Sequence, residues 1–172
     1  HPGVERVVIL SPDKDMAQCV REDGRVVTFN RREGRFYDAD GVNEKFGVRP
    51  ASIPDYLALV GDSADGFPGL PGWGARSTAT VLSRYPHLED IPDSVSAWDL
   101  KVRGAASLAR TLAEQRDDAL LFRELARLRT DAPIPQTEPE QLRWRGVDRA
   151  AFEAMAVRLR APRLLERLPA HD

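Results

Sequence analysis

Residues 61–74 have the sequence Gly61-Asp-Ser-Ala-Asp-Gly-Phe-Pro-Gly-Leu-Pro-Gly-Trp-Gly74, with five glycines and two prolines in fourteen positions. This composition is incompatible with a regular helix or strand, so we predict a long turn. A helical pattern from Ala75 to Tyr85 follows it directly. Gly72 and Gly74 leave room for a ligand beside the backbone, and the first turn of the helix presents unpaired N–H groups to it. The turn therefore predicts an anion site, for which a DNA phosphate is the natural ligand.

The charges around this turn agree with an anionic ligand. No Asp or Glu occurs between Asp65 and Glu89, whereas Arg76 and Arg84 both lie in that interval. The turn does not match the dinucleotide-binding fingerprint, because the third glycine is absent and no strand leads directly into it. A tight helix–helix turn that binds no ligand is the alternative interpretation.

Short strands and helices are predicted before the turn. The run Val7-Val8-Ile9-Leu10 is apolar and β-branched, which predicts a buried strand of a parallel sheet. The other elements predicted here are a short helix over 13–20, a β-hairpin of segments 25–29 and 35–37, a helix that Asp40 caps and Gly47 ends, and a helix that begins after Ser52 with Pro54 in its first turn.

Helical patterns dominate after the turn. We predict helices over 75–85, 93–102, 107–128 and 147–168, the last interrupted at Pro162, and an extended segment over 130–137. The helix over 107–128 is expected to bury a stripe made of Leu108, Leu112, Leu121, Leu125 and Leu128. This order predicts an α/β fold in which part of a parallel sheet is followed by a mostly helical subdomain.

The composition is that of one ordinary globular domain. The chain has 172 residues, 42% hydrophobic and 30% charged, with 25 Lys and Arg against 27 Asp and Glu. Its overall field therefore does not indicate nucleic acid, and DNA contact must come from local geometry. The single cysteine fits a reducing compartment, and we expect a cytoplasmic protein without a membrane span or signal segment. The start at His1-Pro2-Gly3 is interpreted as an internal cut.

Four carboxylates form two pairs. Asp13 and Asp15 follow the predicted strand, at the sheet edge where ligands gather in open α/β folds, and Asp62 and Asp65 open the glycine-rich turn. Such oxygen ligands suit Mg²⁺ or Mn²⁺. Each pair by itself is also compatible with capping or with an ordinary solvated turn.

Other kinds of site are not favoured by the sequence. The histidines His1, His87 and His171 are scattered, expected at the surface, and form no cluster with the cysteine, so a zinc site is not expected. Ser11 has no plausible His and Asp partners, which argues against an acyl-transfer triad.

The two pairs lie in motifs that resemble those of the 5′-nuclease or flap endonuclease superfamily. Ser11-Pro-Asp-Lys-Asp15 is similar to its T/S-x-D-K-D motif, and residues 59–74 are similar to its L-x-G-D-x-S-D-N-x-P-G-x-x-G-I-G motif. Residues 45–50 and 129–133 also resemble family landmarks, so the resemblance covers about residues 4 to 135. The chain departs from the pattern at Ala64, Gly66 and Trp73, and it has Arg76 and Ser77 where lysine and threonine are usual.

The resemblance implies a structure-specific 5′-3′ exonuclease or flap endonuclease that hydrolyses DNA with two or more Mg²⁺ or Mn²⁺ ions. Its metal ligands would be Asp13, Asp15 and Asp65, with Asp62 reaching an ion directly or through water. A helix–three-turn–helix motif would hold duplex or branched DNA by its phosphates, and can hold a monovalent cation such as K⁺ on its carbonyls. The phosphate contacts expected on this basis are Gly69, Gly72, Trp73, Gly74, Arg76 and Ser77.

The resemblance also implies a missing part. The family's N-terminal half carries further acids and the arch that threads the 5′ flap, and nothing in this chain can supply them. We therefore expect residues 1–60 to complete an α/β nuclease core, 61–86 to form the metal turn and DNA-binding motif, and 87–172 to form the helical subdomain. The strand at 7–10 should fold against the N-terminal half, and the chain alone should be inactive.

Two other functions remain open at this stage. A pure DNA-binding module of the helix-hairpin-helix type would need only the glycine turn, and Asp13 with Asp15 argue against it, because such a module does not require paired acids. An α/β hydrolase or phosphatase that acts on other substrates would use the aspartates alone, and would show no salt-dependent DNA binding.

Overall fold

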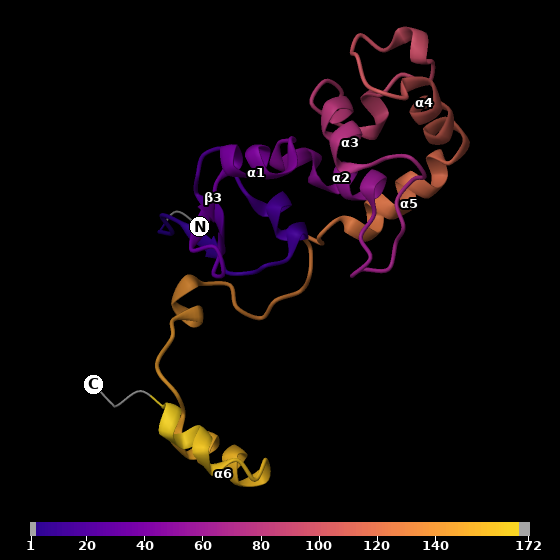
Figure 1. Ribbon diagram of the computed structural model, residues 1–172. Helices are drawn as coiled ribbons and strands as arrows, with labels where there is room; N and C mark the ends of the chain where they lie inside the picture. The colour runs from indigo at the N-terminus through magenta and orange to yellow at the C-terminus, as the bar shows by residue number, and fades with distance from the viewer. Residues whose placement is uncertain (1–2, 169–172) are drawn as a thin grey trace. The chain divides into compact units, whose positions relative to one another are not determined.

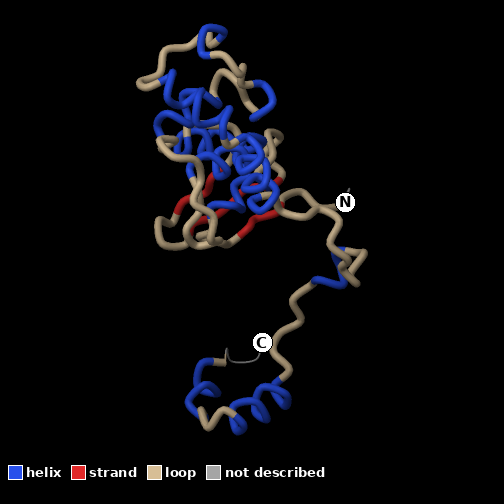
Figure 2. Tube along the Cα trace, turned by 90° about the vertical axis from the view of Figure 1, so that its right-hand side faces the viewer, coloured by secondary structure: helices blue, strands red, loops and turns tan. Residues whose placement is uncertain are grey.

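The computed structural model describes residues 3–168, which form two compact units, residues 3–132 and residues 133–168 (Figure 1). The first unit contains a small sheet and most of the helices. Figure 2 shows its strands gathered at one end of the unit and most of its helices at the other. Among the described residues, no helix combines the length and the apolar character that crossing a membrane would require. His1 and His171 lie outside the described residues.

The sheet has three strands in the order β1 (Val7–Ile9), β2 (Val26–Asn30) and β3 (Arg35–Tyr37). β1 runs parallel to β2 with Val8 opposite Val27, while β2 and β3 form the predicted hairpin and are antiparallel. Phe29 and Phe36 stand opposite each other in this hairpin, with ring centroids 4.6 Å apart. The sheet is therefore mixed, with one parallel and one antiparallel pair among the described residues.

The predicted burial of the first strand is wrong for this chain. Val7 and Val8 are 44% and 46% exposed, and Leu10, just after the strand, is 61% exposed. The reason is that β1 is the edge strand of the sheet, and β2 is its one neighbour among the described residues.

Helix α1 (Ala39–Phe46) follows β3 directly, and Asp38 rather than Asp40 caps it. The Asp38 carboxylate accepts a hydrogen bond from the Gly41 N–H at 2.9 Å, whereas Asp40 lies inside the first turn and pairs with Arg49. Gly47 ends the helix in the left-handed conformation with φ 74°, as predicted.

Helix α2 (Ile53–Val60) is the centre of the core, and the short 3-10 turn η2 (Pro50–Ser52) leads into it. Ile53, Leu57 and Leu59 are completely or almost completely buried. α2 packs against α3 (Ala75–Leu82) and α5 (Arg116–Ala126), so the helices on both sides of the glycine-rich turn share one apolar core.

A buried carboxylate also ties α2 to the later helices. Asp55 is 2% exposed and accepts hydrogen bonds from the Leu88 N–H at 3.2 Å and from Arg123 of α5 at 3.0 Å. The exposed His87 places its Nδ1 3.0 Å from the same carboxylate. Because Asp55 is surrounded by donors, its burial is compatible with a stable fold.

The helix predicted over 107–128 is two helices, α4 (Ala105–Glu114) and α5, separated at Gln115, whose φ is −123°. Leu108 and Leu112 are buried as predicted, but Leu121 and Leu125 are 55% and 59% exposed. The break at Gln115 changes which face of α5 meets the core. Small side chains pack there instead, namely Ala119 and Ala126.

The helix predicted over 93–102 is also wrong. Only the 3-10 turn η4 (Val95–Ala97) forms there, and Trp98 returns to an extended conformation. Tertiary contacts explain the difference, because the Trp98 indole donates to the Pro92 carbonyl at 2.8 Å and Asp99 pairs with Arg84. Arg84, counted above among the positive charges near the turn, is therefore paired with an acid.

Short elements complete the chain. In the first unit these are η1 (Lys14–Cys19) and η3 (Leu88–Asp90). The second unit contains η5 (Pro139–Leu142), η6 (Pro162–Arg167) and α6 (Arg149–Arg158), which Asp148 caps through the Ala151 N–H. A helix was predicted over 147–168 with an interruption at Pro162. The structure confirms its first part as α6, but the break comes earlier, at 159–161, and Pro162 begins the 3-10 helix η6.

The glycine-rich turn is organised by a close crossing of its own backbone. Asp62 and Phe67 pair through two backbone hydrogen bonds of 2.9 and 3.1 Å, and the Leu70 N–H donates to the Leu59 carbonyl at 2.9 Å. Gly61 and Gly69 lie at the crossing, where a Cβ on Gly69 would stand 2.4 Å from the Gly61 nitrogen. Gly69 is buried in this way, so the prediction that it contacts a DNA phosphate is not supported by its position.

Replacing Gly69 by alanine should therefore unfold the turn. Gly66→Ala is a matched control, because Gly66 also has a positive φ (84° against 70°) but open space around its Cβ position. We expect Gly66→Ala to lower the free energy of unfolding by about 1 kcal/mol, the ordinary strain of a left-handed alanine, and Gly69→Ala by roughly 3 kcal/mol or more. Urea denaturation of both variants measures the difference. Equal losses would show that the crossing does not constrain the fold.

Candidate metal centre

The first pair of acids is positioned by the start of η1. Asp13 is the N-cap of this 3-10 helix, and its Oδ1 accepts a hydrogen bond from the Asp15 N–H at 3.2 Å. This bond keeps the Asp13 side chain at the surface and turns Asp15 inward, where it is only 5% exposed. The two acids therefore differ although they are close in the sequence: Asp13 is exposed and caps η1, whereas Asp15 is buried.

The second pair is positioned by the glycine-rich turn. Asp62 is 2% exposed, and its Oδ1 accepts a hydrogen bond from the Ala64 N–H at 3.0 Å. Its other oxygen, Oδ2, lies 2.7 Å from the Lys14 ammonium. Asp65 follows on the same turn and is exposed to solvent.

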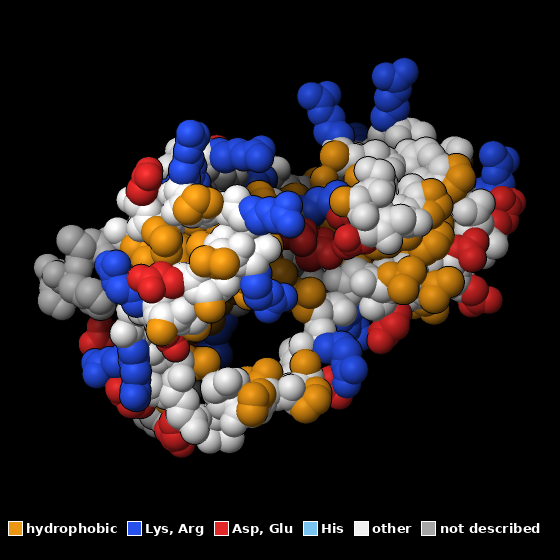
Figure 3. All heavy atoms as spheres, turned by 90° about the horizontal axis from the view of Figure 1, so that it is seen from below, with side chains coloured by type: hydrophobic (Ala, Val, Ile, Leu, Met, Phe, Trp, Pro, Cys, Tyr) orange, Lys and Arg blue, Asp and Glu red, His pale blue; other side chains and the backbone are white. Residues whose placement is uncertain are grey.

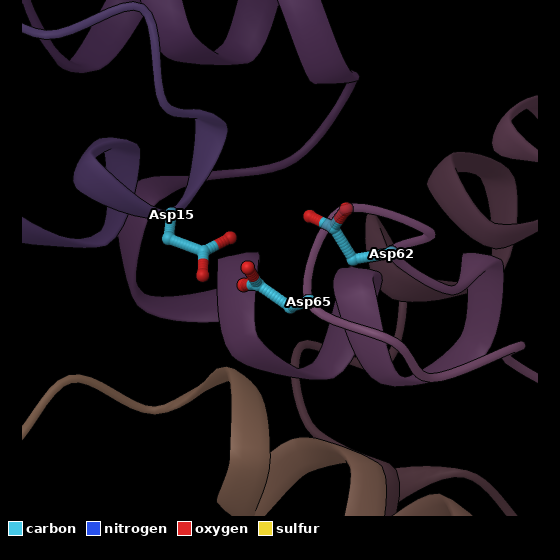
Figure 4. Close-up of side chains that lie close together, drawn as sticks. All are labelled: Asp15, Asp62 and Asp65. Carbon is cyan, nitrogen blue, oxygen red and sulfur yellow. The ribbon is translucent and has the colours of Figure 1, made fainter.

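Three of the four predicted acids converge. Carboxylate oxygens of Asp15, Asp62 and Asp65 all lie within 4.8 Å of one another. Figure 4 shows Asp15 entering from η1 and the other two from the turn, with the Asp15 and Asp65 carboxylates facing each other. Asp13 is not a member of this group, because its side chain caps η1 instead. Of the four acids expected from sequence, the structure therefore brings together Asp15, Asp62 and Asp65 but not Asp13.

The crowding of negative charge is visible in the ionisation of Asp15. Burial is the largest cause that raises the pKa of Asp15, followed by a hydrogen bond with Asp65 and by the charges of Asp13, Asp65 and Asp62, which together bring it to about 7. Its Oδ1 is buried without a hydrogen-bond partner. A buried carboxylate oxygen that lacks a partner is costly in a fold, and it is typical of a site that is completed by a ligand.

Asp62 has the opposite character. Its burial would raise the pKa, but hydrogen bonds from the Lys14 ammonium and the Ala64 N–H outweigh that effect and hold the pKa of Asp62 below its usual range. The cluster thus contains one ionised, fully paired carboxylate beside one, Asp15, whose raised pKa of about 7 leaves it only partly ionised at neutral pH.

The donor set fits a hard divalent cation. Three carboxylates, one of which has a buried oxygen without a partner, are ligands of the kind that Mg²⁺ and Mn²⁺ take. No His or Cys belongs to the cluster among the described residues. Figure 3 shows a group of acidic side chains (red) recessed in one face of the molecule.

The residues predicted to bind phosphate divide into two groups. Gly72, Gly74 and Arg76 are exposed, and Arg76 makes no ion pair within the described part of the chain. Ser77 is half-buried, and its hydroxyl closes the first turn of α3 by accepting from the Gly74 N–H at 3.1 Å and donating to the Gly74 carbonyl at 2.9 Å.

Trp73 is a correction to this set. Its side chain is 4% exposed, its indole N–H donates to the Leu108 carbonyl at 3.2 Å, and its backbone N–H donates to the Leu70 carbonyl. Both donors are therefore used inside the protein, and Trp73 anchors the turn rather than offering a phosphate contact.

Comparison with known proteins places this arrangement in a family. The family model described as 5′-3′ exonuclease, C-terminal SAM fold, matches residues 48–150, which is more than half of the chain. The chain belongs to the 5′-3′ exonuclease family. The matched region contains the turn with Asp62 and Asp65, α3, α4 and α5.

Curated relatives of this 5′-3′ exonuclease family member are considerably longer. DNA polymerase I of Pseudomonas aeruginosa is 40% identical over 136 residues, which cover 74% of this chain and 14% of that protein. The 5′-3′ exonuclease of Buchnera aphidicola is 32% identical over 131 residues, which cover 76% of this chain and 45% of that protein. The chain thus spans less than half the length of either relative.

A solved structure shares the fold. The phage T5 flap endonuclease, crystallised as a pseudo-enzyme–product complex with DNA and metal ions, superposes with a TM-score of 0.57 over 71% of this chain and 43% of that one, at 18% identity. At this identity the likeness supports the mixed α/β fold with its small sheet and several helices.

Sequence reasoning missed Lys14. It lies between Asp13 and Asp15 in the first motif, and that position was a signal that its side chain would share the environment of the acids. The structure shows that it reaches the second motif, through Asp62.

The raised pKa of Asp15 predicts how stability depends on pH without divalent ions. Between the ordinary value of 3.8 and about 7, the folded state holds a proton that the unfolded state releases, so the free energy of unfolding falls as pH rises through this window. Asp15→Asn removes this dependence and should stabilise the chain at pH 8 by up to about 3 kcal/mol, but change little at pH 4.

Thermal unfolding in EDTA at pH 4, 6 and 8 measures this effect. The exposed Asp117→Asn is the control, since it makes the same chemical change away from the cluster. A wild-type protein and an Asp15→Asn variant with parallel pH profiles would contradict the ionisation described for Asp15.

Proposed function

We propose that this chain is the C-terminal half of a divalent-metal-dependent 5′-nuclease, which hydrolyses DNA phosphodiesters as a 5′-3′ exonuclease and flap endonuclease. The observation that carries the proposal is the convergence of Asp15, Asp62 and Asp65, from two separate motifs, around a buried oxygen without a partner. Membership of the 5′-3′ exonuclease family supports it, as do relatives named 5′-3′ exonuclease and DNA polymerase I.

In this proposal the acids hold Mg²⁺ or Mn²⁺. Asp15 and Asp65 offer their facing oxygens, Asp62 lies at the side of the cluster, and Asp13 acts by fixing the start of η1 and by adding negative charge. When bound, divalent cations would supply an activated water and would offset charge on the phosphate. The protein contributes the rigid positions of the ligands, because Asp62 is paired to Phe67 through its backbone and Asp15 is tied to Asp13.

The exposed face of the turn is the proposed contact with DNA. We propose that 61–86 act as a helix–three-turn–helix in which Gly72, Gly74, Arg76 and Ser77 meet phosphates of one strand. A monovalent cation such as K⁺ on the carbonyls of the turn belongs to the same proposal. Phosphate contacts of this type carry no sequence information, which suits an enzyme that recognises DNA structure.

The N-terminal half of the enzyme is the proposed partner of the first unit. The chain spans 45% of the Buchnera exonuclease, and Val7 and Val8 of the edge strand are exposed, as is Leu10 just after it. An exposed apolar strand edge is suited to pairing with further polypeptide. We propose that residues 1–60 complete an α/β nuclease core with that partner, that 61–86 and 87–172 follow as DNA-binding motif and helical subdomain, and that the enzyme works in the bacterial cytoplasm.

Activity provides the direct test. The 172-residue chain, assayed with Mn²⁺ on a 5′-flap duplex, should be inactive alone and should cleave after addition of the N-terminal piece of a family member. Asp15→Asn should abolish that cleavage, with a loss of roughly a thousandfold or more, while the exposed Asp117→Asn should retain it. Robust cleavage by the chain alone, or full activity of Asp15→Asn, would refute the assignment.

DNA binding tests the turn separately from the metal centre. Gly74 has an extended φ of −101° and open space at its Cβ position, so Gly74→Val should fold normally while blocking the approach of a phosphate. We expect DNA affinity to fall roughly tenfold in Gly74→Val and several-fold in Arg76→Ala, with no dependence on sequence and a steep fall with salt.

Arg103→Ala is the matched control for Arg76→Ala, because Arg103 is also exposed and lies outside the turn. Fluorescence anisotropy with two flap duplexes of unrelated sequence measures all four proteins in EDTA. A strong preference for one sequence that persists at high salt would contradict phosphate-only contact.

A further inference from the structure

Lys14 connects the two acidic motifs. Its ammonium lies 2.7 Å from Oδ2 of Asp62, although the two residues are far apart in the sequence. The side chain of Lys14 is 38% exposed and that of Asp62 only 2% exposed. The ammonium therefore reaches the carboxylate cluster from the solvent side.

The three carboxylates differ in the hydrogen-bond donors that their oxygens already have. Both oxygens of Asp62 have donors, the Ala64 N–H on one and Lys14 on the other. Oδ1 of Asp15 has none, and the Asp15 carboxylate faces that of Asp65. The open side of the cluster thus lies between Asp15 and Asp65, while its Asp62 side already holds one positive charge.

We propose that Lys14 is a resident counter-ion of the cluster, which a second divalent cation must displace from Asp62 after a first cation has bound between Asp15 and Asp65. The inference rests on the proposed function, because it concerns the same metal centre. An ammonium and a metal ion compete for the same carboxylate oxygen, since each needs its lone pairs and both carry positive charge.

The two partners are unequal in their freedom to move. Asp62 is held by its backbone pairing with Phe67 and by the Ala64 N–H, so it cannot follow a retreating ammonium. Lys14 has a flexible four-carbon stem and is partly solvated, so its ammonium can return to water without becoming a buried unpaired charge. Displacement of Lys14 is therefore the low-cost way to free Asp62 for a metal.

The cluster should therefore bind two divalent cations with unequal affinities. The first cation meets an unpartnered oxygen and excess negative charge, whereas the second must replace an ion pair that already exists. Removal of the ammonium should strengthen the second binding event selectively. The same change should destabilise the metal-free chain, because it leaves Asp62 as a buried carboxylate without its cation.

Mn²⁺ titration by isothermal calorimetry, without DNA, tests the proposal on the 172-residue chain. Lys14→Met keeps the length of the side chain and removes its charge. We expect the weaker of two Mn²⁺ affinities to rise roughly tenfold or more in Lys14→Met, with the stronger one much less affected. Lys45→Met is the matched control, because Lys45 borders the same small pocket as Lys14 but contacts the rings of Tyr37 and Phe46 instead of Asp62.

A second measurement uses the wild-type protein, so its result does not depend on whether Lys14→Met folds. Acylation of lysine amines by a reactive ester, followed by mass spectrometry, reports whether each ammonium is engaged. Reactivity at Lys14 should rise several-fold when Mg²⁺ is added at saturating concentration. Lys45 and Lys101, the other two lysines of the chain, serve as internal standards and should not change.

The outcomes separate this inference from the proposed function. If Mn²⁺ binds the wild-type chain but its weaker affinity is the same or lower in Lys14→Met, or if Mg²⁺ leaves Lys14 equally or less reactive, the counter-ion role is overturned and the metal centre stands. If neither the wild-type chain nor Lys14→Met binds Mn²⁺, both proposals fail. Equal gains in Lys14→Met and Lys45→Met would also overturn the role, because they would indicate a general effect of net charge.

Discussion

The close crossing of the backbone at Gly61 and Gly69 sets the geometry of the whole region. It places Asp62 and Asp65 on a turn that is closed by the backbone pairing of Asp62 with Phe67, and the chain leads from this turn to the start of α3. A side chain at either glycine would force the strands of the turn apart. The candidate metal centre and the exposed face of α3 are therefore linked through a few residues of rigid backbone, which fixes the distance between them.

Local patterns predicted the fold best where a single element carries the information. The hairpin, the helix ended by Gly47 and the buried helix α2 follow from β-branched segments, a left-handed glycine and an apolar face. The patterns failed where tertiary contacts decide. Residues 93–102 have a helical composition, but Trp98 bonds back to Pro92 and packs against Trp73, and Asp99 pairs with Arg84. The break at Gln115 could not be read from an uninterrupted run of helix-forming residues.

The sequence predicted which residues belong to the candidate site better than it predicted how those residues are arranged. The resemblance to the nuclease motifs assigned Asp13, Asp15, Asp62 and Asp65 to one metal site, and the structure brings the carboxylates of the last three together. Spacing could not show that Asp13 turns outward to cap η1, nor that Lys14 crosses to Asp62. Both facts depend on three-dimensional direction, since adjacent residues at the start of a 3-10 helix point to different sides.

The hydrogen bond from the Trp73 indole to the Leu108 carbonyl has a consequence for affinity. It joins the tip of the glycine turn to α4, and Trp73 also packs against Trp98 with ring centroids 6.4 Å apart. A loop so rich in glycine would ordinarily lose much conformational entropy when a ligand orders it. Here the contacts of Trp73 already hold the turn in place, so in the proposed function less of the free energy of each phosphate contact would be lost to ordering the turn.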